Sequence, residues 1–370
     1  MTNHQRLLDL VQPHLLQAPP YVPVQPPEVL AQRLGVPVER IDKLDANENP
    51  YGPSPKAVEA LAKHGGYHIY PDPEQRRLRE VLGNYVGYGS EWIVPGAGSD
   101  ELIELCCRLF MGPEQSLLNF PPTFGMYSFL AGTLGRGLVN VQRRDDFGLD
   151  IEGTLSAAED AGLIFAASPN NPTGNSLTRA EVDALLSTGR PVVIDEAYAE
   201  FAGSSYVPLV RERPNLIIIR TLSKWAGLAG LRVGYMVCDP AVAEITMRIK
   251  QPYNINVAAE VASLASFSDI ALLRERVDTI RGERDRLAAG LAELPGFTVY
   301  PSTANFVLCR IDGIEAKRVQ QKLMDRGIMV RFFDTALLQN HLRFSAGRPD
   351  QTDRLLAALK DIVPAGSRVS

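Results

Sequence analysis

Cysteine is scarce in this sequence, and the few cysteines follow no disulfide or metal-binding pattern. The chain has four cysteines among its 370 residues: Cys106 and Cys107 are adjacent, while Cys238 and Cys309 are isolated. None of them forms a CxxC pair. We therefore expect neither a disulfide framework nor a zinc site built from thiolates, and no metal is predicted.

The sequence also lacks an excess of basic residues and any long apolar run. Lysine and arginine total 38 against 43 aspartates and glutamates, so the net charge is −5, which argues against a nucleic-acid partner. No apolar run approaches the roughly 18 residues that span a bilayer. The N-terminus, MTNHQRLLDL, does not resemble a secretion signal, so we expect a cytoplasmic protein with no membrane partner.

Proline is concentrated near the N-terminus. Seven prolines lie between residues 13 and 37, and proline is not tolerated inside a helix. We therefore predict an extended arm over residues 1–46. We expect the arm to pack on the small domain or on a dimer interface, because it carries apolar residues that can be buried: Tyr21, Val22, Val24, Val29 and Leu30.

The rest of the chain predicts an α/β fold with two domains. Between residues 47 and 268, short apolar runs alternate with helical patterns, and the runs lie at 117–120, 138–141, 163–167, 192–194, 216–219 and 233–237. Several runs lack in/out alternation, which is typical of strands buried on both faces. This rhythm predicts a large domain with a mostly parallel sheet flanked by helices. Residues 269–370, which begin with a long amphipathic helix at 274–294, predict a smaller α+β domain.

The strongest local signal is a lysine after one of these apolar runs. Lys224 follows Thr221 and Ser223, and a glycine-rich turn leads from it to Arg232. A buried lysine can react with an aldehyde as a neutral amine. Hydroxyls and a guanidinium beside a glycine-rich turn suit a phosphate group. Together these residues favour a reactive lysine next to a phosphate site.

A second signal is Asp195, which ends another buried run. A buried carboxylate needs a cationic partner, and a protonated pyridine nitrogen would serve. Tyr198 lies three residues on, and Asn171 follows the run at 163–167. The alternative, that Asp195 only caps the next element, stays open at this point.

The remaining polar signals are weaker. Gly96-Ala97-Gly98 precedes a predicted helix at 99–110, where free backbone N–H groups would bind an anion. The turn matches neither the dinucleotide nor the P-loop spacing. Arg331 and Arg343 sit at comparable positions in two C-terminal strands. They are either surface arginines or a clamp for a carboxylate or phosphate.

Taken in order, these motifs resemble the fold-type I aminotransferases that use pyridoxal 5′-phosphate (PLP). The match is most similar to the histidinol-phosphate aminotransferases and extends from about residue 43 to 348. The motifs that carry it are 44–52, 70–73, 168–174, 195–198, 221–235 and 342–347. The resemblance implies a PLP-binding domain at 47–268 and a small domain at 269–370.

The resemblance also implies a role for each candidate residue. Lys224 is the lysine that carries the cofactor and shuttles the proton, and Asp195 pairs with the pyridine nitrogen. Asn171 and Tyr198 hold the ring oxygen, and Phe124 stacks on the ring, where many family members have tyrosine. The phosphate is held by Ser99, Asp100, Thr221, Ser223 and Arg232, with Tyr70 reaching the cofactor of a neighbouring subunit.

The implied reaction is the transamination of L-histidinol phosphate with 2-oxoglutarate, which gives imidazole acetol phosphate and L-glutamate in histidine biosynthesis. Arg331 and Arg343 would then hold the anionic end of the substrate, helped by Asn171. A homodimer follows from the role of Tyr70. Three alternatives remain: an aromatic aminotransferase, a threonine-phosphate decarboxylase, and a non-catalytic PLP-fold binding module.

Overall fold

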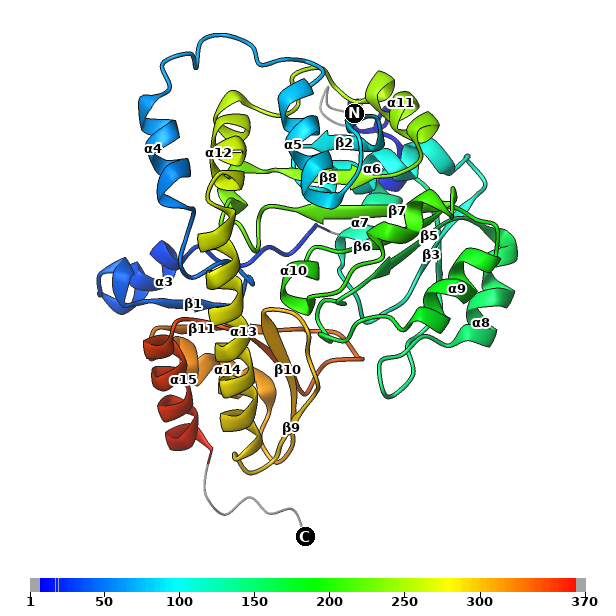
Figure 1. Ribbon diagram of the computed structural model, residues 1–370. Helices are drawn as coiled ribbons and strands as arrows, with labels where there is room; N and C mark the ends of the chain where they lie inside the picture. Colours follow the sequence, from blue (N-terminus) through cyan, green and yellow to red (C-terminus); the bar gives the residue numbers. More distant parts are fainter. Residues whose placement is uncertain (1–6, 17, 19, 364–370) are drawn as a thin grey trace.

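A seven-stranded sheet forms the centre of the larger part of the molecule (Figure 1). The computed structural model describes residues 7–16, 18 and 20–363. The strands are β2 (Ile93–Gly96), β3 (Ser116–Asn119), β4 (Gly137–Asn140), β5 (Ala161–Ala167), β6 (Val192–Asp195), β7 (Leu216–Thr221) and β8 (Gly234–Val237). Their order is β2-β8-β7-β6-β5-β3-β4, and β8 alone runs antiparallel to its neighbours. The predicted mostly parallel sheet is confirmed.

The strands of this sheet are buried on both faces, which explains their unbroken apolar runs. In β6, Val192 and Ile194 contribute to one apolar core, whereas Val193 contributes to the core on the other face. Helices cover both faces: α5 (Arg76–Val86), α6 (Ser99–Phe110), α7 (Met126–Thr133), α8 (Ile151–Ala157), α9 (Arg179–Ser187), α10 (Ala199–Ala202), α11 (Pro240–Ile249) and α12 (Val257–Phe267). A further helix, α4 (Pro55–Lys63), packs against α12. Short 3-10 turns occupy Val38–Arg40, Ser90–Trp92, Ala158–Asp160, Val207–Arg211 and Ala229–Leu231.

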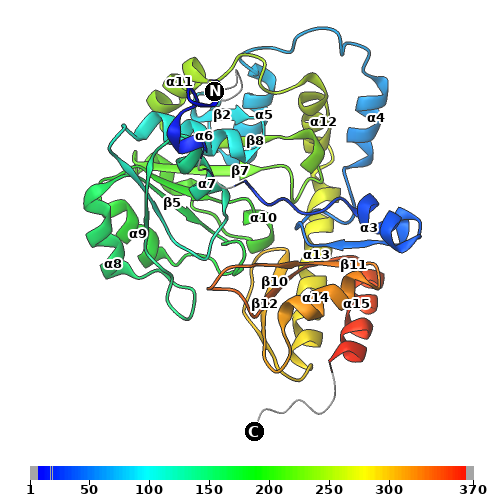
Figure 2. The same ribbon diagram turned by 180° about the vertical axis from the view of Figure 1, so that it is seen from behind.

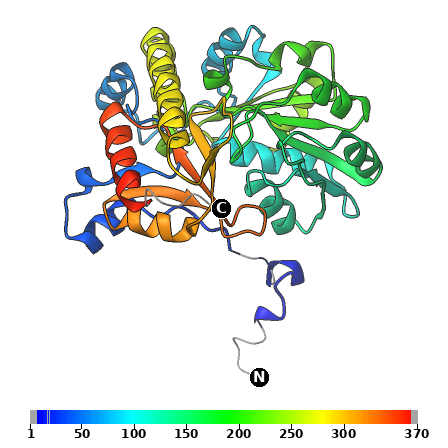
Figure 3. The same ribbon diagram turned by 90° about the horizontal axis from the view of Figure 1, so that it is seen from below.

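A smaller, five-stranded sheet lies beside the large one (Figure 3). It orders β1 (Asp42–Leu44), β11 (Ile328–Phe332), β12 (His341–Ser345), β10 (Phe306–Ile311) and β9 (Phe297–Val299), and it packs with α13 (Ile270–Ala292), α14 (Ala316–Met324) and α15 (Pro349–Ile362). The first half of α13 packs in a core of the large unit through Leu273 and Val277, and its second half packs in the small core through Leu287 and Leu291. This helix connects the two units, so the boundary near residue 268 stays a prediction.

The sequence predicted an extended arm over residues 1–46, and the structure shows that this is wrong in part; residues 1–6, 17 and 19 of the arm lie outside the described residues. The arm contains α2 (Pro13–Leu16) and α3 (Pro27–Leu34). Pro27 is the first residue of α3, where the missing N–H costs no hydrogen bond, and Gly35 ends the helix at φ +67°. The helix α2 contacts α7 in the large unit, and residues 20–26 lead to α3 beside the small unit (Figure 2). There β1 pairs with β11, so the end of the arm is a strand of the small sheet.

No helix in the described part of the chain is long and apolar enough to cross a membrane. The same residues contain no cluster of three or more side chains suited to a metal ion.

Candidate active site

A cavity of about 800 Å³ opens at the carboxyl ends of β5, β6 and β7, between the two units and the N-terminal arm. This end of an open α/β sheet is where ligands bind. The candidates that line the cavity come from widely separated segments: Ser99, Asp100, Phe124, Asn171, Asp195, Tyr198, Thr221, Ser223, Lys224, Arg232, Arg331 and Arg343. The fold thus brings together every predicted site residue except Tyr70.

Lys224 lies just beyond β7 and is half-buried at the cavity wall. Its Nζ donates a hydrogen bond to the carbonyl oxygen of Ala46, 3.1 Å away. Burial lowers the lysine pKa to about 8, and the positive charge of Arg343 adds to that effect. About a tenth of this amine is therefore neutral, and nucleophilic, at pH 7.

Asp195 ends β6 and is only 5% exposed. Its carboxylate accepts hydrogen bonds from the Tyr127 hydroxyl at 2.7 Å and from the Ala197 amide at 3.0 Å. Burial raises the pKa of Asp195 to about 6. None of the ion pairs within the described residues includes Asp195, so its carboxylate suits a cation brought by a ligand.

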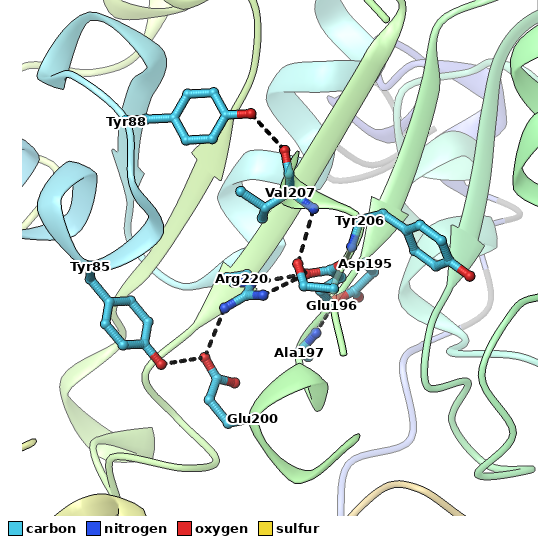
Figure 4. Close-up of polar contacts among 10 residues, drawn as sticks. Tyr85, Tyr88, Asp195, Glu196, Ala197, Glu200, Tyr206, Val207 and Arg220 are labelled. Atoms are coloured by element: carbon cyan, nitrogen blue, oxygen red, sulfur yellow. Dashed lines mark hydrogen bonds and ion pairs between the residues drawn. The ribbon is translucent and has the colours of Figure 1, made fainter. Parts of the chain in front are cut away.

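The residue after Asp195, Glu196, is not among the residues that line the cavity, and its polar contacts are drawn in Figure 4. Glu196 is buried and accepts two hydrogen bonds from Arg220, from Nη2 at 2.8 Å and from Nε at 3.0 Å. Arg220 also pairs with Glu200 at 3.2 Å. Alternation along the strands sends Asp195 and Thr221 to the cavity and their neighbours Glu196 and Arg220 to the rear. The buried ion pair thus joins the ends of β6 and β7 behind the site.

An anion site is built where α6 begins. Gly98 adopts φ +82°, its amide donates to the carbonyl of Gly96 at 2.8 Å, and the Ala97 amide donates to Glu101. In the described structure the amides of Ser99 and Asp100 donate to no other protein group, as expected in the first turn of a helix.

The guanidinium of Arg232 lies directly beside this turn. A Cβ on Gly98 would lie 2.5 Å from Nη2 of Arg232, and that same nitrogen pairs with the Asp100 carboxylate at 2.9 Å. The hydroxyls of Thr221 and Ser223 belong to the same wall of the cavity, and Thr221 Oγ1 donates a hydrogen bond to Ser223 Oγ at 2.9 Å. A guanidinium, two hydroxyls and free helix amides are the donor set that a phosphate needs.

Two positively charged arginines line the cavity on the side of the small sheet. Arg331 and Arg343 are cross-strand neighbours in β11 and β12. Arg343 is 5% exposed and donates to Asn171 Oδ1 at 2.5 Å and to the Asp45 carbonyl, while its Nε is buried without a hydrogen-bond partner among the described residues. Burial lowers the pKa of Arg343 to about 10. Arg331 donates to the Val22 carbonyl of the arm at 3.3 Å.

Sequence reasoning assigned no role to several residues that hold the site together. Asn47, at φ +55°, donates from Nδ2 to the Tyr198 hydroxyl at 3.0 Å and accepts from the Ser345 hydroxyl at 2.8 Å. Tyr127, the partner of Asp195, also meets Phe124 edge-on with ring centroids 5.6 Å apart. Asn47 belongs to the recognised motif at 44–52, which is the signal that could have found it. The arm residue Tyr21 lines the cavity and had no such signal.

Tyr70 lies outside the cavity of its own chain. Its side chain is 79% exposed and stacks on Tyr253 with ring centroids 4.6 Å apart. The predicted contact with a neighbouring subunit therefore stays a prediction.

The family model for class I and II aminotransferases matches residues 40–359. A histidinol-phosphate aminotransferase of Roseiflexus castenholzii is 51% identical over 95% of this chain and 98% of its own. A chloroplastic histidinol-phosphate aminotransferase of Arabidopsis thaliana is 44% identical over 95% of this chain and 85% of its own.

Solved structures of this family are also similar to the chain. The histidinol-phosphate aminotransferase of Sinorhizobium meliloti, solved in complex with pyridoxal 5′-phosphate, is 30% identical with a TM-score of 0.85 over 95% of this chain and 97% of its own. A threonine-phosphate decarboxylase of Porphyromonas gingivalis has a TM-score of 0.77 over 87% of this chain and 99% of its own, at 20% identity, so it shares the fold alone.

Proposed function

The chain belongs to the class I and II aminotransferase family, and from this premise we propose that it transfers the amino group of L-histidinol phosphate to 2-oxoglutarate. The products are imidazole acetol phosphate and L-glutamate, and the pathway is L-histidine biosynthesis. Support comes from relatives of that name at 51% and 44% identity, which align over nearly the whole chain.

The cofactor of this proposal is pyridoxal 5′-phosphate, and the residues present fit it. Lys224 would carry its aldehyde carbon, Asp195 would hold the proton on its ring nitrogen, and Phe124 would lie on its ring. Asn171 and Tyr198 would hold the ring oxygen, and the anion site at the start of α6 would bind the phosphate. When bound, the cofactor supplies a ring that accepts the electron pair released as the amino-bearing carbon loses its proton.

Lys224 is also the proposed general base. With a pKa of about 8, its Nζ would take the proton from the carbon that bears the amino group and hold it for return. Asp195, buried without a cation among its hydrogen-bond partners, would be fully ionised once it pairs with a protonated ring nitrogen. The two groups have opposite tasks, one moving a proton and one holding a proton in place.

The observation that carries the substrate assignment is the adjacent pair Arg331 and Arg343, with the Arg343 Nε buried and without a partner in the described part of the chain. Two neighbouring guanidinium groups suit a phosphate, which has up to two negative charges and three acceptor oxygens. Histidinol phosphate has no carboxylate, so its phosphate is the anion available to them. Assays of the purified protein with 2-oxoglutarate should give a higher kcat/KM for histidinol phosphate than for phenylalanine. A preference for phenylalanine would favour an aromatic aminotransferase instead.

A homodimer is part of the proposal, because the exposed Tyr70 has no place in the cavity of its own chain. The cytoplasmic location expected from the sequence also stays a prediction, which fractionation of the source cells would test.

A further inference from the structure

Glu101 connects the anion-binding turn to a segment far away in the sequence. Its Oε2 accepts one hydrogen bond from the Ala97 amide at 2.5 Å and another from Asn254 Nδ2 at 2.7 Å. Ala97 lies two residues before Ser99, which lines the cavity and whose amide has no acceptor among the described residues. Asn254 lies in the connection between α11 and α12. A single carboxylate oxygen therefore ties this connection to the turn.

Asn254 continues the network with its other atom. Its Oδ1 accepts hydrogen bonds from Gln75 Nε2 and from Lys250 Nζ, each at 2.8 Å. Gln75 is completely buried and precedes α5 in a left-handed conformation, with φ +48°. Lys250 is 5% exposed and also reaches the Pro73 carbonyl at 3.4 Å. Asn254 thus also holds residues 73–75, which follow Tyr70, directly through Gln75 and indirectly through Lys250.

The chemistry of the two ends fixes the orientation of the Asn254 amide. Lys250 is only a donor and the Glu101 carboxylate is only an acceptor, so the asparagine must present oxygen to one and nitrogen to the other. A reversed amide would face donors with its NH₂ group and an acceptor with its oxygen. The neighbouring residue, Tyr253, adopts φ +60° and stacks on Tyr70, which adds a second tie to that segment.

We propose that Glu101 and Asn254 are positioning residues that hold the turn at Gly96–Gly98 so that the Ser99 and Asp100 amides face the cofactor phosphate. The Glu101 carboxylate takes the Ala97 amide out of the anion site, and Asn254 fixes where that carboxylate lies. The phosphate then meets a preset pair of amides instead of a turn that has to be ordered on binding. This inference rests on the proposed use of a phosphorylated cofactor.

The test compares two ligands that differ only in the phosphate. The dissociation constants of pyridoxal 5′-phosphate and of pyridoxal are measured for the full-length chain after removal of its cofactor. Asn254→Ala should weaken binding of the phosphorylated ligand by about tenfold or more and leave binding of pyridoxal nearly unchanged. A general loss of structure would weaken both ligands.

Two further variants make the comparison specific. Glu101→Gln keeps an oxygen that can accept both hydrogen bonds, so this variant should retain most of the preference for the phosphorylated ligand. Glu101→Leu keeps no acceptor, so its preference for the phosphorylated ligand should fall as far as that of Asn254→Ala. The matched control is Asn215→Ala, because Asn215 is another half-buried asparagine whose amide holds backbone carbonyls, those of Leu186 and Arg190, away from this site. That control should leave the ratio of the two constants unchanged.

Different failures have different meanings. An unchanged ratio in both Asn254→Ala and Glu101→Leu would overturn the positioning role while leaving the proposed function intact. If Asn254→Ala does not fold, the Glu101→Leu and Glu101→Gln pair decides by the same ratio. A wild-type chain that does not prefer the phosphorylated ligand would overturn the proposed function itself, and this inference with it.

Discussion

Replacing Asp195 with asparagine should make the cofactor-free protein relatively more stable as the pH rises, although the same change impairs the loaded enzyme. The carboxylate of Asp195 is buried, and its pKa is raised from 3.8 to about 6 because burial disfavours the charged form. A carboxyl group whose pKa is higher in the folded than in the unfolded protein stabilises the folded protein most below the unfolded-state pKa. This contribution to folding stability is lost as the pH rises through the folded-state pKa. Above pH 6 the ionised Asp195 should therefore cost the cofactor-free protein about 3 kcal/mol.

Asparagine has no such titration, so the difference between variant and wild type should depend on pH. Applying the two pKa values, the variant should gain about 1.5 kcal/mol relative to wild type between pH 5 and pH 8. Urea unfolding of both cofactor-free proteins at these two pH values measures this change, and constant effects such as an altered hydrogen bond from Tyr127 cancel. The same difference in unfolding free energy at pH 5 and pH 8 would refute the reasoning.

With the cofactor bound, the Asp195→Asn substitution should be harmful instead of favourable. In the proposed function the carboxylate would then pair with the protonated ring nitrogen, so its loss should lower kcat at least about hundredfold, or roughly 3 kcal/mol in the barrier. Steady-state assays with histidinol phosphate check this. An unchanged kcat would mean that Asp195 only caps the chain after β6.

The other predictions concern the lysine, the subunit contact and the arginine pair. Lys224→Ala should abolish turnover but still bind pyridoxal 5′-phosphate through its phosphate, and near-normal turnover of this variant would contradict the catalytic role of Lys224. Borohydride treatment of the wild-type holoenzyme should label Lys224 in a peptide map. The rate at which the cofactor-free protein takes up pyridoxal 5′-phosphate should rise with a midpoint near pH 8, because only the neutral amine reacts; a midpoint above pH 10 would show that the pKa is not lowered. Mixing the inactive Lys224→Ala and Tyr70→Ala proteins should restore part of the activity, since a heterodimer has one intact site; verified heterodimers without activity would count against a shared site. Arg331→Ala should reduce kcat/KM for histidinol phosphate roughly 10- to 150-fold and affect phenylalanine little, with Arg331→Lys recovering part of the loss.

The central strands were predictable from sequence because burial on both faces leaves a clear mark. The runs that became β5, β6 and β7 are apolar and rich in β-branched residues. In contrast, β2 was missed because Pro95 and Gly96 make half of it look like a turn. It lies at the edge of the sheet, where a strand tolerates proline. The strand β1 was missed because it is three residues long and its partner β11 lies far along the chain.

The candidate site divides in the same way. Residues at the end of a buried strand or shortly after it, such as Asp195 and Lys224, could be located from local pattern and from the order of motifs. Asn47 meets Ser345 from 298 positions away, so no local pattern reveals that contact. The helix α3 was missed for a different reason, since Pro27 was read as a helix breaker although the first position of a helix accepts proline.

The most direct test of the central claim is a single half-reaction. The holoenzyme is mixed with an equimolar amount of L-histidinol phosphate and no 2-oxoglutarate, and the visible absorbance of the cofactor and the products are followed. The proposed function predicts loss of that absorbance with formation of one equivalent of imidazole acetol phosphate, and later addition of 2-oxoglutarate should restore the absorbance and yield one equivalent of glutamate. An unchanged spectrum with histidinol phosphate, together with a full response to phenylalanine, would contradict it.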